Sequence, residues 1–234
     1  MSRNSSKLFQ RITNQKPPRK RFLILCEGAE TEPNYFKSFQ QIGRDNQTVT
    51  IIIEPLGAVG ITVVTEAIKR KQQDGDYEED EVWCVFDRDA KKENNNKQNF
   101  NEAIRLAFEN KLNLAVSNDA FELWFLLHYE YYQSETHRSD LKEMLSENKR
   151  LGEKYEKNSE NMYEKLKDKQ FDAIKFAKKL WNSHKSNDNE NDEKELSVQE
   201  SIERHNQNPS TTVYKLVEKL NEIIIKKNKN QESE

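Results

Sequence analysis

Apolar runs of about five residues alternate with amphipathic segments along the first half of the chain. Most of these runs have no polar face and are short, as in strands that are buried on both sides of a parallel sheet. Between them, apolar residues recur at helical spacing, so strands and helices alternate. The pattern predicts an α/β fold with a doubly wound, mostly parallel four-stranded sheet and right-handed crossovers. The expected strands cover residues 22–26, 49–54, 82–86 and 112–116.

The pattern changes after residue 130, where charged and polar residues separate short amphipathic stretches. This change indicates an α/β domain followed by a C-terminal helical extension. The expected segments are a basic, flexible arm over 1–21, the α/β domain over 22–130, the helical extension over 131–226, a disordered polar loop near 182–197 and a polar tail over 227–234.

Composition agrees with a chain that is partly solvated. Apolar residues make up 34% of the 234 residues and the mean hydropathy is -1.07, whereas an average domain is about 45–50% apolar when glycine is counted. No apolar stretch approaches the roughly 20 residues of a membrane span, and the N-terminus has no signal-peptide core. We therefore expect a soluble, cytoplasmic protein without a membrane partner. Cys26 and Cys84 lie inside expected strands, which favours buried free thiols.

Carboxylates follow the first and the third expected strands. Glu27 comes directly after the first strand, and Asp87 and Asp89 come after the third. If these strands are parallel neighbours, the three acids meet at one edge of the sheet, where α/β proteins bind ligands. Their mutual repulsion would be relieved by Mg²⁺, which prefers hard oxygen ligands, and such a centre suits phosphoryl chemistry on a phosphodiester. The plainer alternatives are a loop acid at Glu27 and ordinary turn chemistry in the Asp-x-Asp segment.

Several segments of the chain resemble motifs of the RloB-like family. They are CEGAETEPNYF at 26–36, VFDRD at 85–89, SNDAFELW at 117–124 with His128 beyond it, and NPST at 208–211. The glutamate after the first strand and the Asp-x-Asp after the third are also similar to the arrangement in Toprim domains. Asp119 departs from the family pattern, in which proline is expected, so the start of the following helix stays open.

The resemblance implies a Toprim-like fold, a metal-dependent nuclease-type centre and a setting in prokaryotic anti-phage defence. It also implies an ABC-type ATPase partner, because the family commonly occurs beside one. Related Toprim effectors of defence systems cleave transfer RNA. For this chain the resemblance therefore suggests an endoribonuclease that uses Mg²⁺ or Mn²⁺.

Glu27, Asp87 and Asp89 are the expected metal ligands and catalytic acids, with Glu27 also a candidate general base. Glu122 and His128 are the other catalytic candidates. Glu122 could instead complete a capping box with Asp119. His128 lies about 120° round the helix from Glu122, so the two are not expected to act as a dyad, and a buried helix histidine is the alternative.

Nucleic-acid binding depends on local patches, because the net charge of the whole chain is -3. The basic arm would suit a phosphate backbone, although a solvated tail explains it equally well. Arg88 could contact phosphate or simply be solvated. The candidate nucleic-acid contacts are Arg19, Lys20, Arg21, Arg88, Lys91, Lys92 and Lys97.

Several functions remain open from the sequence. The first is a Mg²⁺-dependent endoribonuclease acting on transfer RNA, and a DNA-nicking Toprim nuclease is its alternative. A second class is a non-catalytic binding or regulatory subunit of an ABC-type ATPase complex, and homo-oligomerisation is compatible with either class. A haloacid-dehalogenase-like or receiver-like phosphoprotein is disfavoured by the order of the acids. A haloacid-dehalogenase nucleophile normally lies in an Asp-x-Asp after the first strand, where this chain has Glu27 alone.

Overall fold

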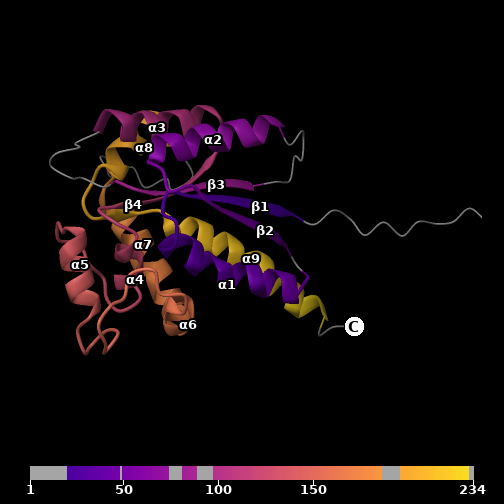
Figure 1. The fold of residues 1–234 in the computed structure, drawn as a ribbon. Helices are drawn as coiled ribbons and strands as arrows, with labels where there is room; N and C mark the ends of the chain where they lie inside the picture. The colour runs from indigo at the N-terminus through magenta and orange to yellow at the C-terminus, as the bar shows by residue number, and fades with distance from the viewer. Residues whose placement is uncertain (1–19, 48, 74–80, 89–96, 186–195, 232–234) are drawn as a thin grey trace, which may run out of the picture.

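The structure is a computed structural model that describes residues 20–47, 49–73, 81–88, 97–185 and 196–231, with the backbone alone for 225–231. A central sheet separates two layers of helices (Figure 1). The strands are β1 (Arg21–Cys26), β2 (Thr50–Pro55), β3 (Glu81–Asp87), β4 (Asn113–Asn118) and β5 (Ser210–Thr211). The helices are α1 (Thr31–Asp45), α2 (Gly60–Gln73), α3 (Lys97–Glu109), α4 (Glu122–Leu126), α5 (Arg138–Leu145), α6 (Met162–Leu166), the 3-10 helix η2 (Lys167–Lys169), α7 (Gln170–Ser183), α8 (Val198–His205) and α9 (Val213–Gln231).

The strands of the sheet are ordered β2-β1-β3-β4-β5. The first four are parallel, as the sequence predicts, and β5 is antiparallel to β4. The sheet therefore has five strands in the described chain, and the expected number of four is wrong. The extra strand is the two-residue segment Ser210–Thr211, which the sequence analysis assigned only to a family motif and which is too short to show an alternating pattern.

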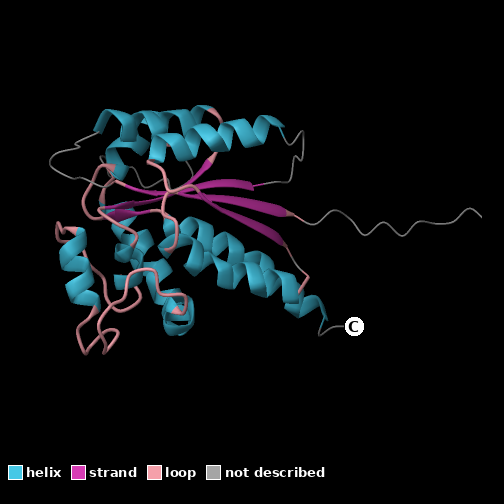
Figure 2. Ribbon diagram, in the orientation of Figure 1, coloured by secondary structure: helices cyan, strands magenta, loops and turns pink. Residues whose placement is uncertain are grey.

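Helices cover both faces of the sheet, which explains why the strands lack a polar face. In Figure 2, α2, α3 and α8 lie above the strands, and α1 and α9 lie below them. Neighbouring residues of β1 enter different cores: Ile24 and Cys26 pack with α1 and α9, whereas Leu25 packs with α2 and α3. Both cysteines are buried free thiols, as expected. Burial raises the pKa of Cys84 to about 12, so this thiol is neutral at physiological pH.

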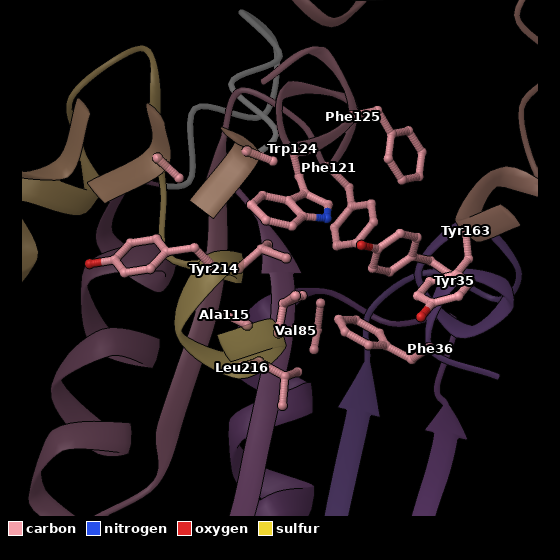
Figure 3. Packing of buried hydrophobic residues seen from close by; sticks show 14 of the residues in the cluster. Tyr35, Phe36, Val85, Ala115, Phe121, Trp124, Phe125, Tyr163, Tyr214 and Leu216 are labelled. Carbon is pink, nitrogen blue, oxygen red and sulfur yellow. The ribbon is translucent and has the colours of Figure 1, made fainter. Parts of the chain in front are cut away.

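An aromatic cluster joins the starts of α1, α4 and α6 (Figure 3). The Tyr35 ring lies 5.4 Å from that of Phe36, 5.9 Å from that of Phe121 and 5.7 Å from that of Tyr163, mostly edge to face. Such contacts add about 0.5–1.5 kcal/mol each to the burial of the rings. The cluster therefore fixes the first turns of α1 and α4, which carry two of the acids described below.

The boundaries expected from sequence change in three places. The α/β domain and the helical extension share one core, because Val213 and Leu216 of α9 pack with β1 and α1. Helix α9 continues to Gln231, beyond the expected start of the polar tail at 227. The apolar stretch after β4 forms only the five residues Glu122–Leu126 of regular helix. The arm before Lys20 and most of the polar loop at 182–197 lie outside the described residues.

Candidate metal centre

The C-terminal ends of β1 and β3 lie side by side at the topological switch point of the sheet, because β2 lies on one side of β1 and β3 on the other. Ligands of open α/β sheets usually bind at this point. Glu27 follows β1, and its backbone N–H donates to the Val85 carbonyl at 2.8 Å, so it extends the strand ladder. Asp87 ends β3, and its backbone N–H donates to Glu27 Oε2 at 2.8 Å. The expected convergence of Glu27 and Asp87 is therefore confirmed. Asp89 lies outside the described residues.

A pocket of about 270 Å³ opens at these strand ends. Its lining includes residues of α4 and α5, the helices at the left in Figure 1. The lining residues are Glu27, Gly28, Ala29, Glu30, Thr31, Glu32, Asp87, Phe121, Glu122, Arg138, Lys142, Lys157 and Asn158. Acids from the sheet edge therefore face bases from the region after residue 130. We call Glu27, Glu32, Asp87 and Glu122 the acidic side, and Arg138, Lys142 and Lys157 the basic side.

Two acids of the pocket come from helix starts. Glu32 lies in the first turn of α1 and Glu122 in the first turn of α4, and both are about 95% buried. Gly28 admits the Glu32 carboxylate, because a Cβ at that position would overlap its oxygens. Glu122 Oε1 accepts a hydrogen bond from the Tyr155 hydroxyl at 3.2 Å. Glu32 could not be singled out from the sequence, since an acid in the first turn of a helix commonly stabilises the helix dipole.

The acidic side carries more negative charge than its surroundings easily stabilise. Burial raises the pKa of Asp87 well above its usual range, and the charges of Glu32, Glu27 and Glu122 raise it further, while Arg138 opposes them. Burial also raises the pKa of Glu32, with Glu122 adding to the effect. Backbone hydrogen bonds and Lys157 act in the other direction. The pocket therefore favours protons or cations on these carboxyl groups.

The donor set suits a hard divalent cation. Asp87 Oδ1 is buried and has no hydrogen-bond partner among the described residues, and the neighbouring ligands are all carboxylate oxygens, which Mg²⁺ and Mn²⁺ prefer. As the side chains stand, however, no group of three or more His, Cys, Asp or Glu in the described part of the chain is spaced to hold a metal ion. The residues fit a metal by chemistry, and ligation would need movements of their side chains.

Asp119 holds Arg138 at the pocket and does not cap α4. Its carboxylate accepts hydrogen bonds from the Arg138 backbone N–H at 3.0 Å and from Nε at 3.3 Å, and its carbonyl accepts one from Nη2 at 3.0 Å. The residue before α4 is Phe121, which makes no side-chain cap. The proposed capping box is therefore wrong, because the buried carboxylate of Asp119 is already bound to α5.

His128 lies away from the pocket. Its ring is buried 4.8 Å from the Trp124 ring, and its Nδ1 lies 2.8 Å from the Trp124 carbonyl oxygen. Burial lowers the pKa of His128 to about 4, so the imidazole is neutral at physiological pH. Since it does not line the pocket, the structure matches the alternative of a buried helix histidine and gives it no catalytic contact.

The expected nucleic-acid contacts are not gathered at the pocket. Lys20 and Arg21 lie at the start of β1, a strand length of about 20 Å from the acids, and Lys20 pairs with Glu81 at 2.5 Å. Arg88 is 9% exposed, with its guanidinium 5.0 Å from the Phe100 ring, so the idea that it is solvated is wrong. Lys97 is exposed at the start of α3. Arg19, Lys91 and Lys92 lie outside the described residues.

The chain is an α/β protein of the Toprim-like class, because its mostly parallel sheet has helices on both faces and acids gather at the ends of its strands. The family model described as RloB-like protein matches residues 22–220. The chain belongs to the RloB-like family. No match was found among curated proteins or among solved structures. In the described residues, no helix is both long and apolar enough to cross a membrane.

Proposed function

We propose that the protein is a Mg²⁺- or Mn²⁺-dependent nuclease of the Toprim type, and that its substrate is RNA, with transfer RNA as the first candidate. The observation that carries this proposal is the pocket at the ends of β1 and β3, where the half-buried Glu27 and Asp87 meet the buried Glu32 and Glu122. Asp87 Oδ1 is unpaired in the described chain. A structural acid cluster would satisfy its oxygens internally, whereas this cluster keeps oxygen donors beside an open pocket. Membership of the RloB-like family supports the proposal of a defence role and of an ABC-type ATPase partner.

Glu27, Glu32, Asp87 and Glu122 would hold the cation, which supplies positive charge to the scissile phosphate when it is bound. Glu27 is positioned for the proton of the attacking oxygen, because the Asp87 N–H fixes one of its carboxylate oxygens at the pocket. That attacking oxygen is a water molecule or, in RNA, the ribose 2′-hydroxyl. Tyr35 is excluded as a nucleophile by its burial in the aromatic cluster, where its hydroxyl accepts a hydrogen bond from Gln170 Nε2.

The test is cleavage of total transfer RNA and, separately, of supercoiled plasmid. Each substrate is incubated with the protein in Mg²⁺, Mn²⁺ or EDTA, with and without any ABC-type ATPase that is encoded beside it. Asp87→Asn is compared with Asp172→Asn, the same chemical change at an exposed position of α7. The proposal expects discrete RNA fragments that require the metal, disappear with Asp87→Asn and persist with Asp172→Asn.

Other outcomes separate the alternatives. Nicked plasmid with intact RNA would keep the catalytic centre and assign DNA as the substrate. Absence of cleavage in every condition, while the folded protein still binds the ATPase, would favour the non-catalytic binding subunit. RNA cleavage that survives in EDTA or in Asp87→Asn would contradict the metal-dependent mechanism.

A further inference from the structure

The basic side of the pocket is built by elements outside the sheet. Arg138 and Lys142 are four residues apart on α5, so they share one face of that helix. Lys157 comes from the segment between α5 and α6, and all three residues line the pocket. The cations therefore converge on the acids from separate parts of the chain, although the sequence pattern after residue 130 indicated a helical extension and singled out none of the three.

Arg138 is held in a defined orientation. Asp119, which is 2% exposed, binds its backbone N–H, its Nε and its Nη2, while the side chain of Arg138 stays 23% exposed. A guanidinium whose plane is fixed loses little conformational entropy when it binds the oxygens of a phosphate, and its fork matches them in geometry.

The segment that carries Lys157 is tied down on both sides. The Tyr155 hydroxyl donates to Glu122 Oε1 at 3.2 Å. Asn158 Oδ1 accepts from the Thr31 hydroxyl, and its carbonyl accepts from Asn34 Nδ2, both at 2.8 Å. Lys157 lies between these anchors and is itself exposed, so its ammonium group stays at the pocket mouth without being buried.

We propose that Arg138, Lys142 and Lys157 bind the phosphodiester backbone of a single nucleic-acid strand, and that Asp119 positions Arg138 for this contact. The inference deepens the proposed function and rests on it for the identity of the substrate. A cavity of about 270 Å³ is at the small end of ligand pockets. It admits a phosphate with its adjoining groups and has no room for a duplex. The competing explanation is that the cations only offset the charge of Asp87 and Glu32.

The salt dependence of binding separates these explanations, because each phosphate contact on a single strand adds about -0.7 to the slope of log K against log salt. The probe is a fluorescein-labelled single-stranded RNA 12-mer, measured by anisotropy in EDTA so that cleavage does not interfere. The variants are Arg138→Gln, Lys142→Gln, Lys157→Gln and the triple variant. Lys175→Gln on α7 is the control, because it removes an exposed charge away from the pocket.

We expect the slope to become less negative by about 0.7 in each single variant and by about 2 in the triple variant. Lys175→Gln should leave the slope unchanged. A triple variant with the slope of Lys175→Gln would overturn the proposal. Asp119→Asn should weaken binding in the wild-type background and have no further effect in Arg138→Gln. Equal weakening in both backgrounds would refute its positioning role. Thermal unfolding and circular dichroism verify that each variant is folded.

The same variants distinguish failure of this inference from failure of the proposed function. If no condition gives cleavage but the triple variant lowers the slope, the basic side binds a strand and the enzyme assignment is wrong. If cleavage requires Asp87 but the slope of the triple variant is unchanged, the enzyme assignment stands and the phosphate-binding role is wrong. Calorimetric titration with Mn²⁺ provides the check on the acidic side, and the triple variant should still bind the ion.

Discussion

The two sides of the pocket differ in how they are built. Two residues of the acidic side are fixed by the sheet, because Glu27 extends the ladder of β1 and Asp87 ends β3 beside it. The other two, Glu32 and Glu122, lie in the first turns of α1 and α4. The basic side depends on side-chain anchors, namely Asp119 for Arg138 and Glu122 and Thr31 for the segment around Lys157. The difference teaches that the groups proposed to act on a substrate lie on the sheet and the helices packed against it. The groups proposed to select and orient the substrate lie on later elements that can vary independently.

The largest expected effect breaks the acidic side. Glu27→Gln keeps the shape of the side chain but removes its capacity to take a proton and weakens it as a metal ligand. We expect cleavage to fall by about 10²–10⁴-fold, the usual contribution of a positioned general base. The rate is measured with end-labelled RNA under single-turnover conditions, with Glu109→Gln at the exposed end of α3 as the matched control. A rate within threefold of the wild type would remove Glu27 from the mechanism.

The next effect addresses the basic side. Arg138→Gln removes the charge, and we expect cleavage to fall by about 10²–10³-fold, as when one oriented donor to a reacting oxyanion is lost. Arg138→Lys restores the charge without the planar fork, so it should recover only part of the rate. Single-turnover rates of the two variants provide the comparison. Full activity in Arg138→Gln, or full recovery in Arg138→Lys, would show that the fixed geometry supplied by Asp119 is irrelevant to catalysis.

The same contrast explains what could be predicted from the sequence. Glu27 and Asp87 follow uninterrupted apolar strands, and parallel strands place their carboxyl ends together, so local pattern and topology were enough. The doubly wound sheet was predictable for the same reason. The strand β5 was not, because two residues carry no periodicity and their pairing depends on α9 returning to the sheet.

The remaining site residues depend on contacts far apart in the sequence. Glu32 resembles any acid in a first helical turn until the fold brings it against Gly28 and Asp87. In the sequence, Arg138 and Lys157 look like ordinary surface cations. Arg138 is placed by its bond to Asp119, 19 residues away. Lys157 is placed by its neighbour Asn158, which bonds to Thr31, 127 residues away. No pattern of hydrophobic spacing records such side-chain pairs, which explains why the predicted nucleic-acid contacts were sought at Lys20 and Arg21 instead.

A smaller effect tests the link between the two sides. Tyr155→Phe removes the hydroxyl that donates to Glu122 and leaves the packing of the ring unchanged. Loss of an outer hydrogen bond to a ligand typically lowers metal affinity about 10–100-fold, so we expect a reduction of this size for Mn²⁺ in calorimetric titration. Tyr131→Phe, at a half-buried position, is the control. Unchanged Mn²⁺ affinity in Tyr155→Phe would mean that Glu122 is not a ligand or needs no support from this segment.

The smallest effect concerns stability without metal. Burial and the nearby carboxylates raise the pKa of Asp87 in the folded state. A raised folded pKa stabilises the protein below the unfolded value of about 3.9, and this contribution is lost as pH rises through the folded pKa. Asn at position 87 does not ionise, so Asp87→Asn does not lose this part of the free energy of unfolding. If that part is roughly 1 kcal/mol, the Tm of Asp87→Asn in EDTA should exceed that of the wild type by about 2–4 °C near pH 7. The difference in Tm should shrink toward pH 4. His128 and His205, with pKa values lowered to about 4 and about 3, do not contribute to this difference, because both proteins retain them.

Calorimetric unfolding from pH 4 to 8 measures the difference in Tm, with Asp172→Asn as control. Saturating Mg²⁺ should reverse its sign, because only the wild type has the full set of ligands. A gap independent of pH, or a less stable Asp87→Asn in EDTA, would show that the acidic side is already neutralised by the protein's own cations.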